Sequence, residues 1–145
     1  MGFEALTFNT KGDSNVAIGY HALQANTISG GNTAVGFEAL LNYDYITAPP
    51  KNGNTAVGDK AMRAAKTAFQ NTAVGYEALL NNVDGLQEVA IGFQTLQQTM
   101  GITTPGITYN GCENTAVGNL ALQWLRVALL PMQEQRKTTM SPLPM

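Results

Sequence analysis

One stretch of the sequence decides the fold: Asn71-Thr72-Ala73-Val74-Gly75-Tyr76-Glu77-Ala78-Leu79. It returns with few changes along the chain, and self-similarity at a fixed period is typical of repeat architectures. Further copies begin at Asn15, Asn32, Asn54, Glu88 and Asn114, and residues 2–6 form the second half of another. The sequence therefore contains about seven copies of one unit.

The glycine of each copy gives the period. These glycines stand at positions 2, 19, 36, 58, 75, 92 and 118, with spacings of 17, 17, 22, 17, 17 and 26. The base period is 17 residues, and the longer spacings indicate insertions near 41–53 and 97–113. Because both insertions contain Pro and Gly and leave the period intact, we expect them to be loops outside the repeating core.

Each unit has two halves with different preferences. The Thr-Ala-Val half favours a short strand with Ala on one face and Thr and Val on the other. The half after the glycine, such as 76–82, is rich in helix formers and predicts one or two helical turns. The glycine itself indicates a positive φ or a close backbone approach. We expect this structural role for Gly19, Gly36, Gly58, Gly75, Gly92 and Gly118.

Neither half is stable alone, so stacking on neighbouring units has to supply the core. The sequence predicts a mainly β fold, a repetitive β-solenoid or β-roll of 17-residue units over residues 1–122. Stacking also predicts a column of hydrogen-bonded Asn side chains from Asn15 to Asn114. The expected core is the Ala-Leu pair that ends each unit: Ala22, Leu23, Ala39, Leu40, Ala61, Met62, Ala78, Leu79, Leu96, Ala121 and Leu122.

The C-terminal part departs from the repeat. Residues 123–131 are apolar and end at Pro131, which predicts a short helix that caps the last coil or contacts another chain. Residues 132–145 contain Pro142, Pro144 and an Arg136-Lys137 pair, and we expect a flexible tail.

Composition excludes several functions. The 8 Lys and Arg against 10 Asp and Glu give a net charge of −2, which argues against nucleic-acid binding. One cysteine and one histidine do not make a zinc site, and the acidic residues are scattered. The start of the chain shows no signal peptide, and no apolar run predicts membrane insertion. We expect no enzyme activity, catalytic residue, metal or cofactor.

The repeated Asn-Thr-Ala-Val-Gly-Tyr-x-Ala-Leu motif over residues 2–122 resembles repeats of phage tail fibres and related surface fibre proteins. Its Val-Ala-Ile-Gly form, at 16–19 and 89–92, is similar in part to the head repeat of trimeric autotransporter adhesins, which is shorter and Ser-rich. The resemblance implies a non-catalytic homotrimeric segment of an attachment protein. It also implies a place in a virion tail fibre or on a cell surface, with a surface glycan or receptor as partner.

Three surface features carry alternative functions. The insertions offer Tyr43, Tyr45 and Tyr109 as candidate recognition residues, since loops on a rigid scaffold often bind partners. The aromatic residue after the glycine is either a packing contact or a carbohydrate-stacking ladder. The Thr column is either a strand surface or an ice-binding face. A monomeric glycan- or ice-binding module is therefore the alternative to the fibre.

Overall fold

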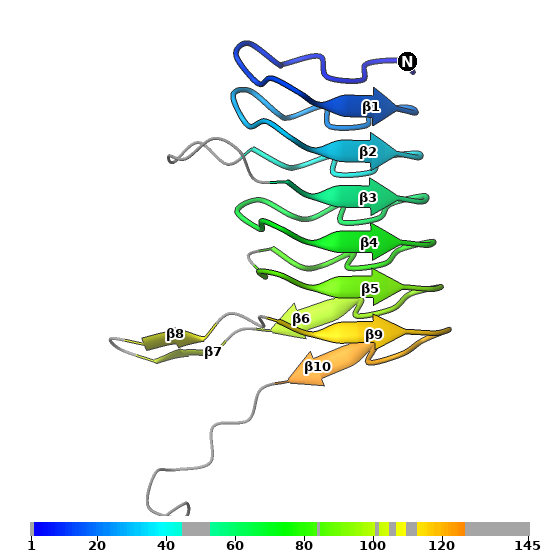
Figure 1. Cartoon of the computed structure of the whole chain (residues 1–145), viewed down its shortest axis with the longest axis vertical. Helices are drawn as coiled ribbons and strands as arrows, with labels where there is room; N and C mark the ends of the chain where they lie inside the picture. Colours follow the sequence, from blue (N-terminus) through cyan, green and yellow to red (C-terminus); the bar gives the residue numbers. More distant parts are fainter. Residues whose placement is uncertain are drawn as a thin grey trace, which may run out of the picture.

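The computed structural model describes residues 2–44, 53–83, 85–100, 102–104, 107–109 and 113–126. These residues form a stack of similar coils, each contributing one short strand to a common sheet (Figure 1). The strands are β1 (Val16–Ile18), β2 (Thr33–Val35), β3 (Thr55–Val57), β4 (Thr72–Val74), β5 (Val89–Ile91), β6 (Gln98–Met100), β7 (Ile102–Thr104), β8 (Ile107–Tyr109), β9 (Thr115–Val117) and β10 (Trp124–Arg126).

The main sheet has six strands in the order β1-β2-β3-β4-β5-β9, and every neighbouring pair is parallel. Its register aligns equivalent residues, so that Ala56 lies beside Ala34 on one side and Ala73 on the other. Both insertions leave this register unchanged, since Thr33 pairs with Thr55 and Val89 with Thr115. The predicted mainly β fold with a parallel, solenoid-like sheet is confirmed.

The predicted helical turns are wrong. No helix occurs in the part of the chain that the structure describes, and the half after each glycine is a run of tight turns. In one coil, Ala22 N–H donates to the Gly19 carbonyl, Gln24 to His21, and Asn26 to Leu23. His21 and Leu23 have φ of 56° and 52°, the left-handed values at the third position of a type II turn. Positive φ at alternate residues is incompatible with a helix.

The alternating φ directs half of the N–H groups along the stack. Leu23 N–H donates to the Ala39 carbonyl of the next coil, while His21 N–H donates to the Phe3 carbonyl of the previous one. A left-handed conformation costs a non-glycine residue roughly 1–2 kcal/mol, and the bonds between coils offset that cost. A helix would satisfy these N–H groups within its own coil and would remove the bonds between coils. The helix propensity of the side chains therefore does not decide the conformation.

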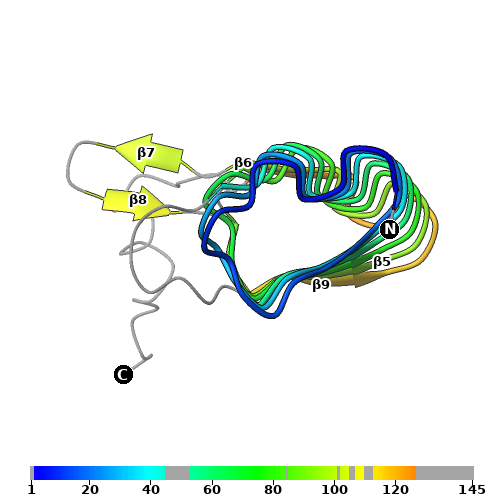
Figure 2. The same ribbon diagram turned by 90° about the horizontal axis from the view of Figure 1, so that it is seen from above.

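Two smaller sheets involve the second insertion and the C-terminal part. Strand β10 pairs in parallel with β6, and β7 pairs with β8 as an antiparallel hairpin that projects from the stack (Figure 2). The predicted apolar helix over 123–131 is wrong at residues 124–126, where backbone pairing with β6 gives a strand; residues 127–131 lie outside the described residues. The predicted tail of 132–145 also lies outside them. Searching the described residues reveals no helix suited to crossing a membrane.

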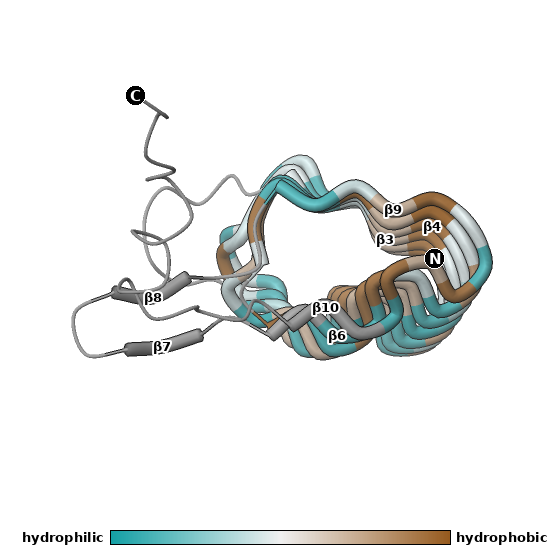
Figure 3. The backbone as a smooth tube through the Cα atoms, turned by 90° about the horizontal axis from the view of Figure 1, so that it is seen from below, coloured by the Kyte–Doolittle hydropathy of each residue, from teal (hydrophilic) through white to brown (hydrophobic). Residues whose placement is uncertain are grey.

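The core is a narrow seam of Ala and Leu between the strand and the turns of each coil. Ala34, Ala56 and Ala73 are fully buried, while the Thr and Val on either side of each face outward. Figure 3 shows apolar residues returning at the same place in each coil. The predicted core is buried from Ala22 to Leu96, but Leu122, in the last described coil, is 49% exposed.

A ladder of Asn side chains runs beside this seam. The Asn54 N–H donates to Asn32 Oδ1 over 3.1 Å, and Asn54 Oδ1 accepts from the Asn71 N–H over 3.1 Å. Each coil is closed by the same amides, since Asn54 Nδ2 donates to the Ala68 carbonyl over 2.9 Å. The predicted bonding of these amides to one another and to the backbone is confirmed.

Replacing Asn54 tests this ladder. Asn54→Ala leaves a buried N–H and a buried carbonyl without partners, so we expect a loss of about 2–4 kcal/mol in the free energy of unfolding. Urea denaturation followed by circular dichroism measures it. Asn81→Ala is the matched control, because Asn81 is exposed and its side chain should contribute little. Equal stability of the two variants would contradict the ladder's role.

Candidate functional site

The motif glycines form a column in which positive φ and close backbone approach hold together from Gly19 to Gly92, while Gly118 has the positive φ alone. Gly58 has a φ of +140°, and a Cβ atom there would lie 2.3 Å from the Gly75 carbonyl oxygen. Gly36 makes the same approach to Gly58, and Gly75 to Gly92. This close contact sets the corner where the strand ends, and it fixes the height at which the following side chain leaves the coil.

The three candidate recognition residues have different outcomes. Tyr43 is fully buried, so its expected role as an exposed recognition residue is wrong. Its N–H donates to the Leu40 carbonyl as Ala65 does to Met62, which places Tyr43 in an inner column at the base of the first insertion. Tyr45 lies outside the described residues. Tyr109 ends β8, in the projecting hairpin (Figure 2).

The outer face of the six-stranded sheet is the most regular surface. The first strand position is Thr in four coils and Val in β1 and β5, and the third is Val or Ile throughout. No residue of these six strands is charged, and Ile18, Ile91 and Val117 are 50%, 40% and 67% exposed. The outward positions of the strands therefore carry only the methyl and hydroxyl groups of Thr, Val and Ile.

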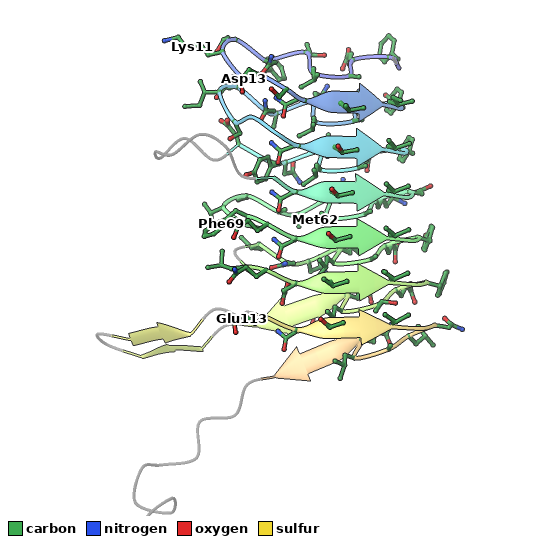
Figure 4. The ribbon with its side chains drawn as sticks, viewed as in Figure 1. Lys11, Asp13, Met62, Phe69 and Glu113 are labelled. Carbon is green, nitrogen blue, oxygen red and sulfur yellow. The ribbon has the colours of Figure 1, made fainter. Side chains whose placement is uncertain are left out.

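A column of aromatic rings follows the glycines at the corner. Phe3 stacks on Tyr20, and Tyr20 on Phe37, with centroids 5.5 and 5.2 Å apart. Tyr76 stacks on Phe93 at 5.2 Å. These rings are nearly parallel and between 40% and 65% exposed, so they present edges to solvent and cover one another's faces. Figure 4 shows side chains in a vertical column beyond the arrowheads of the strands.

The position that follows the aromatic residue carries charged and polar side chains that bond to a side chain of the adjacent coil. His21 Nε2 lies 2.9 Å from Glu4 Oε2, Arg63 Nε lies 2.5 Å from Glu38 Oε2, and Gln94 Nε2 donates to Glu77 over 2.8 Å. Each pair joins adjacent coils. A hydrogen bond to Glu77 raises the pKa of Tyr76, and the negative charges of Glu77 and Asp59 raise it further.

Asp59 interrupts the aromatic column, and sequence reasoning did not single it out as a site. It occupies the position between Phe37 and Tyr76 that a ring takes in the neighbouring coils. The Lys60 ammonium lies 5.9 Å from the Phe37 ring centroid and 6.0 Å from that of Tyr76. The signal available in the sequence was one charged residue in a column of aromatics.

A second exception lies inside the Asn ladder, where Glu88 is fully buried. Its carboxylate accepts from the Asn82 and Asn114 side-chain amides, and its N–H donates to Asn71 Oδ1. The carboxylate continues the ladder with two acceptor oxygens in place of an amide. The Glu88 carboxylate thus helps to close its coil, and the groups that bond to it are side-chain amide donors.

The described surface thus offers a flat uncharged face, a stacked aromatic corner and a hairpin. Within the described ranges, no group of three or more His, Cys, Asp or Glu side chains is arranged to hold a metal ion. Comparison with protein-family models, curated proteins and solved structures finds no match.

The glycine column predicts that one added methyl group greatly lowers the stability of the fold. Gly58→Ala would place Cβ against the Gly75 carbonyl, so we expect loss of the cooperative fold or a destabilisation above about 4 kcal/mol. Gly53→Ala is the control, since Gly53 also has a positive φ, +58°, but nothing within 4 Å of its Cβ position. Thermal unfolding by circular dichroism compares them. Similar melting temperatures would show that the close approach is unimportant.

Proposed function

We propose that this chain is a non-catalytic structural segment of a fibrous attachment protein, a β-solenoid of 17-residue units that assembles as a homotrimer. The observation that carries the proposal is the uncharged outer face of the sheet, which runs unbroken across six strands. Exposed Ile and Val side chains on such a face favour burial against another apolar surface.

A second copy of the chain suits this face because of its spacing. Strands in a sheet lie about 4.8 Å apart, and the Thr and Val rows repeat at that interval. A copy packed with its stack in parallel has the same interval, so every coil meets an equivalent coil at the same height. Three such copies around an axis along the stack form a closed assembly, as in the fibre proteins that the sequence resembles.

The insertions give this fibre segment its attachment surface. The β7–β8 hairpin leaves the coil away from the main sheet (Figure 2). Phe69 and Glu113 lie near the starts of β4 and β9, at the edge of the sheet on the side where the β7–β8 hairpin lies (Figures 1 and 4). A trimer packed through the sheet leaves this edge free. We therefore assign host-cell glycan or receptor binding to the insertions, in a virion tail fibre or on a cell surface.

The oligomeric state tests the proposal. Light scattering should give about three times 15.4 kDa for the intact chain. Val74→Lys puts a charge in the centre of the sheet face and should shift the mass towards that of a monomer, because burying an unpaired charge is costly. Thr67→Lys adds the same charge at an exposed site outside the strands and should leave the trimer intact. A monomeric mass for the unmodified chain would refute the trimer.

One observation favours the alternative, a monomeric ligand-binding module. Thr33, Thr55 and Thr72 pair in register and face outward, so their hydroxyls repeat regularly on a flat surface. Such an array could order water at an ice surface. A monomer that slows ice growth, and loses that effect on Thr55→Lys, would support this reading against the fibre.

A further inference from the structure

The aromatic column has one missing ring, between Phe37 and Tyr76, and no ring covers the two ring faces beside this gap. Tyr20 is covered on both sides by Phe3 and Phe37. Phe37 and Tyr76 instead face the coil of Asp59 from opposite sides. Because neighbouring coils are about 4.8 Å apart, two coils separate these rings by about 10 Å, so the two rings do not stack on each other.

A cation already occupies this gap. The Lys60 ammonium is placed almost equally from the two ring centroids, at 5.9 and 6.0 Å, within the range of cation–π attraction. It lies 3.8 Å from Asp59 Oδ1, beyond hydrogen-bonding distance. That oxygen is buried and has no hydrogen-bond partner. The gap therefore combines two ring faces with a carboxylate oxygen whose bonding capacity is unused.

The charges around the gap favour a cation over an anion. Asp59, Glu38 and Glu77 are negative, whereas Lys60 and Arg63 are positive, and Arg63 is engaged by Glu38. A hydrogen bond to Glu77 and the negative charges of Glu77 and Asp59 raise the pKa of Tyr76, whose ring borders the gap.

We propose that the gap between Phe37 and Tyr76 is a binding site for a guanidinium group, which displaces the Lys60 ammonium and donates hydrogen bonds to Asp59 Oδ1. A guanidinium is flat and stacks on aromatic faces, and it sheds water more easily than an ammonium. Its several N–H donors reach a carboxylate while the plane lies between the rings. Lys60, a compact ammonium on a flexible stem, fills the gap without satisfying that oxygen.

This site is independent of the proposed fibre function. It lies at the corner after the glycines rather than on the outer face of the sheet, and it needs only the residues of one chain. The guanidinium belongs either to a small molecule or to an arginine side chain of a partner protein, and the two sources share the same chemistry at the rings.

Nuclear magnetic resonance titration of the full chain tests the proposal. Methylguanidinium and the peptide acetyl-Gly-Arg-Gly-amide are added separately, and the ring protons of Phe37, Tyr76 and Tyr20 are followed. Saturable shifts are expected at Phe37 and Tyr76 and not at Tyr20, whose faces are covered. Tighter binding of the peptide than of methylguanidinium would identify a partner's arginine as the source, and equal binding would identify a small molecule.

Variants of two half-buried residues separate the site from nonspecific effects. Asp59→Asn keeps the shape and removes the charge, so we expect affinity to fall about tenfold or more. Lys60→Gln removes the internal competitor and should raise affinity several-fold. Circular dichroism checks that both variants keep the fold. Absence of saturable shifts in Lys60→Gln, or shifts that ignore Asp59→Asn and appear equally at Tyr20, would overturn the proposal.

Discussion

The fixed spacing between coils is the constraint on which the rest of the structure depends. Parallel backbone hydrogen bonds join each coil to the next in the strand, at the glycine corner and through the turns. To present N–H and C=O groups in both directions along the stack, the chain accepts left-handed φ at residues as bulky as Leu40 and Met62. Local conformational preference is subordinate to bonding between coils.

This spacing also decides which side chains are compatible with repetition. Identical neighbours are acceptable where they bond or stack on one another, as Asn32 and Asn54 do inside and Tyr20 and Phe37 do outside. A column of identical charges would repel itself at this distance. The column after the aromatics accordingly places His21, Lys60 and Gln94 among its glutamates. His21 pairs with Glu4 and Gln94 with Glu77, each across adjacent coils.

Much of the fold could be predicted from the sequence because stacking makes its pattern explicit. The strands, the inward Ala, the Asn ladder and the close approach of Gly58 all follow from one repeated unit. The tight turns could not be predicted in this way. Residues 76–80 include helix-forming side chains, and only the bonds between coils exclude a helix. Tyr43 was misread because an aromatic residue beside an insertion resembles an exposed contact. The gap at Asp59 requires knowing which residues lie two coils away.

In the main sheet each strand pairs only with the strands of the adjacent coils, and this bears on how the segment responds to force. Hydrogen bonds link residues 17 apart in most coils, 22 apart across the first insertion and 26 apart across the second. No described contact of the main sheet skips a coil. Pulling on the chain ends would therefore peel the stack from its ends, one coil at a time. Each 17-residue coil would release at most about 60 Å of extended chain, so the segment would lengthen in steps rather than rupture at once.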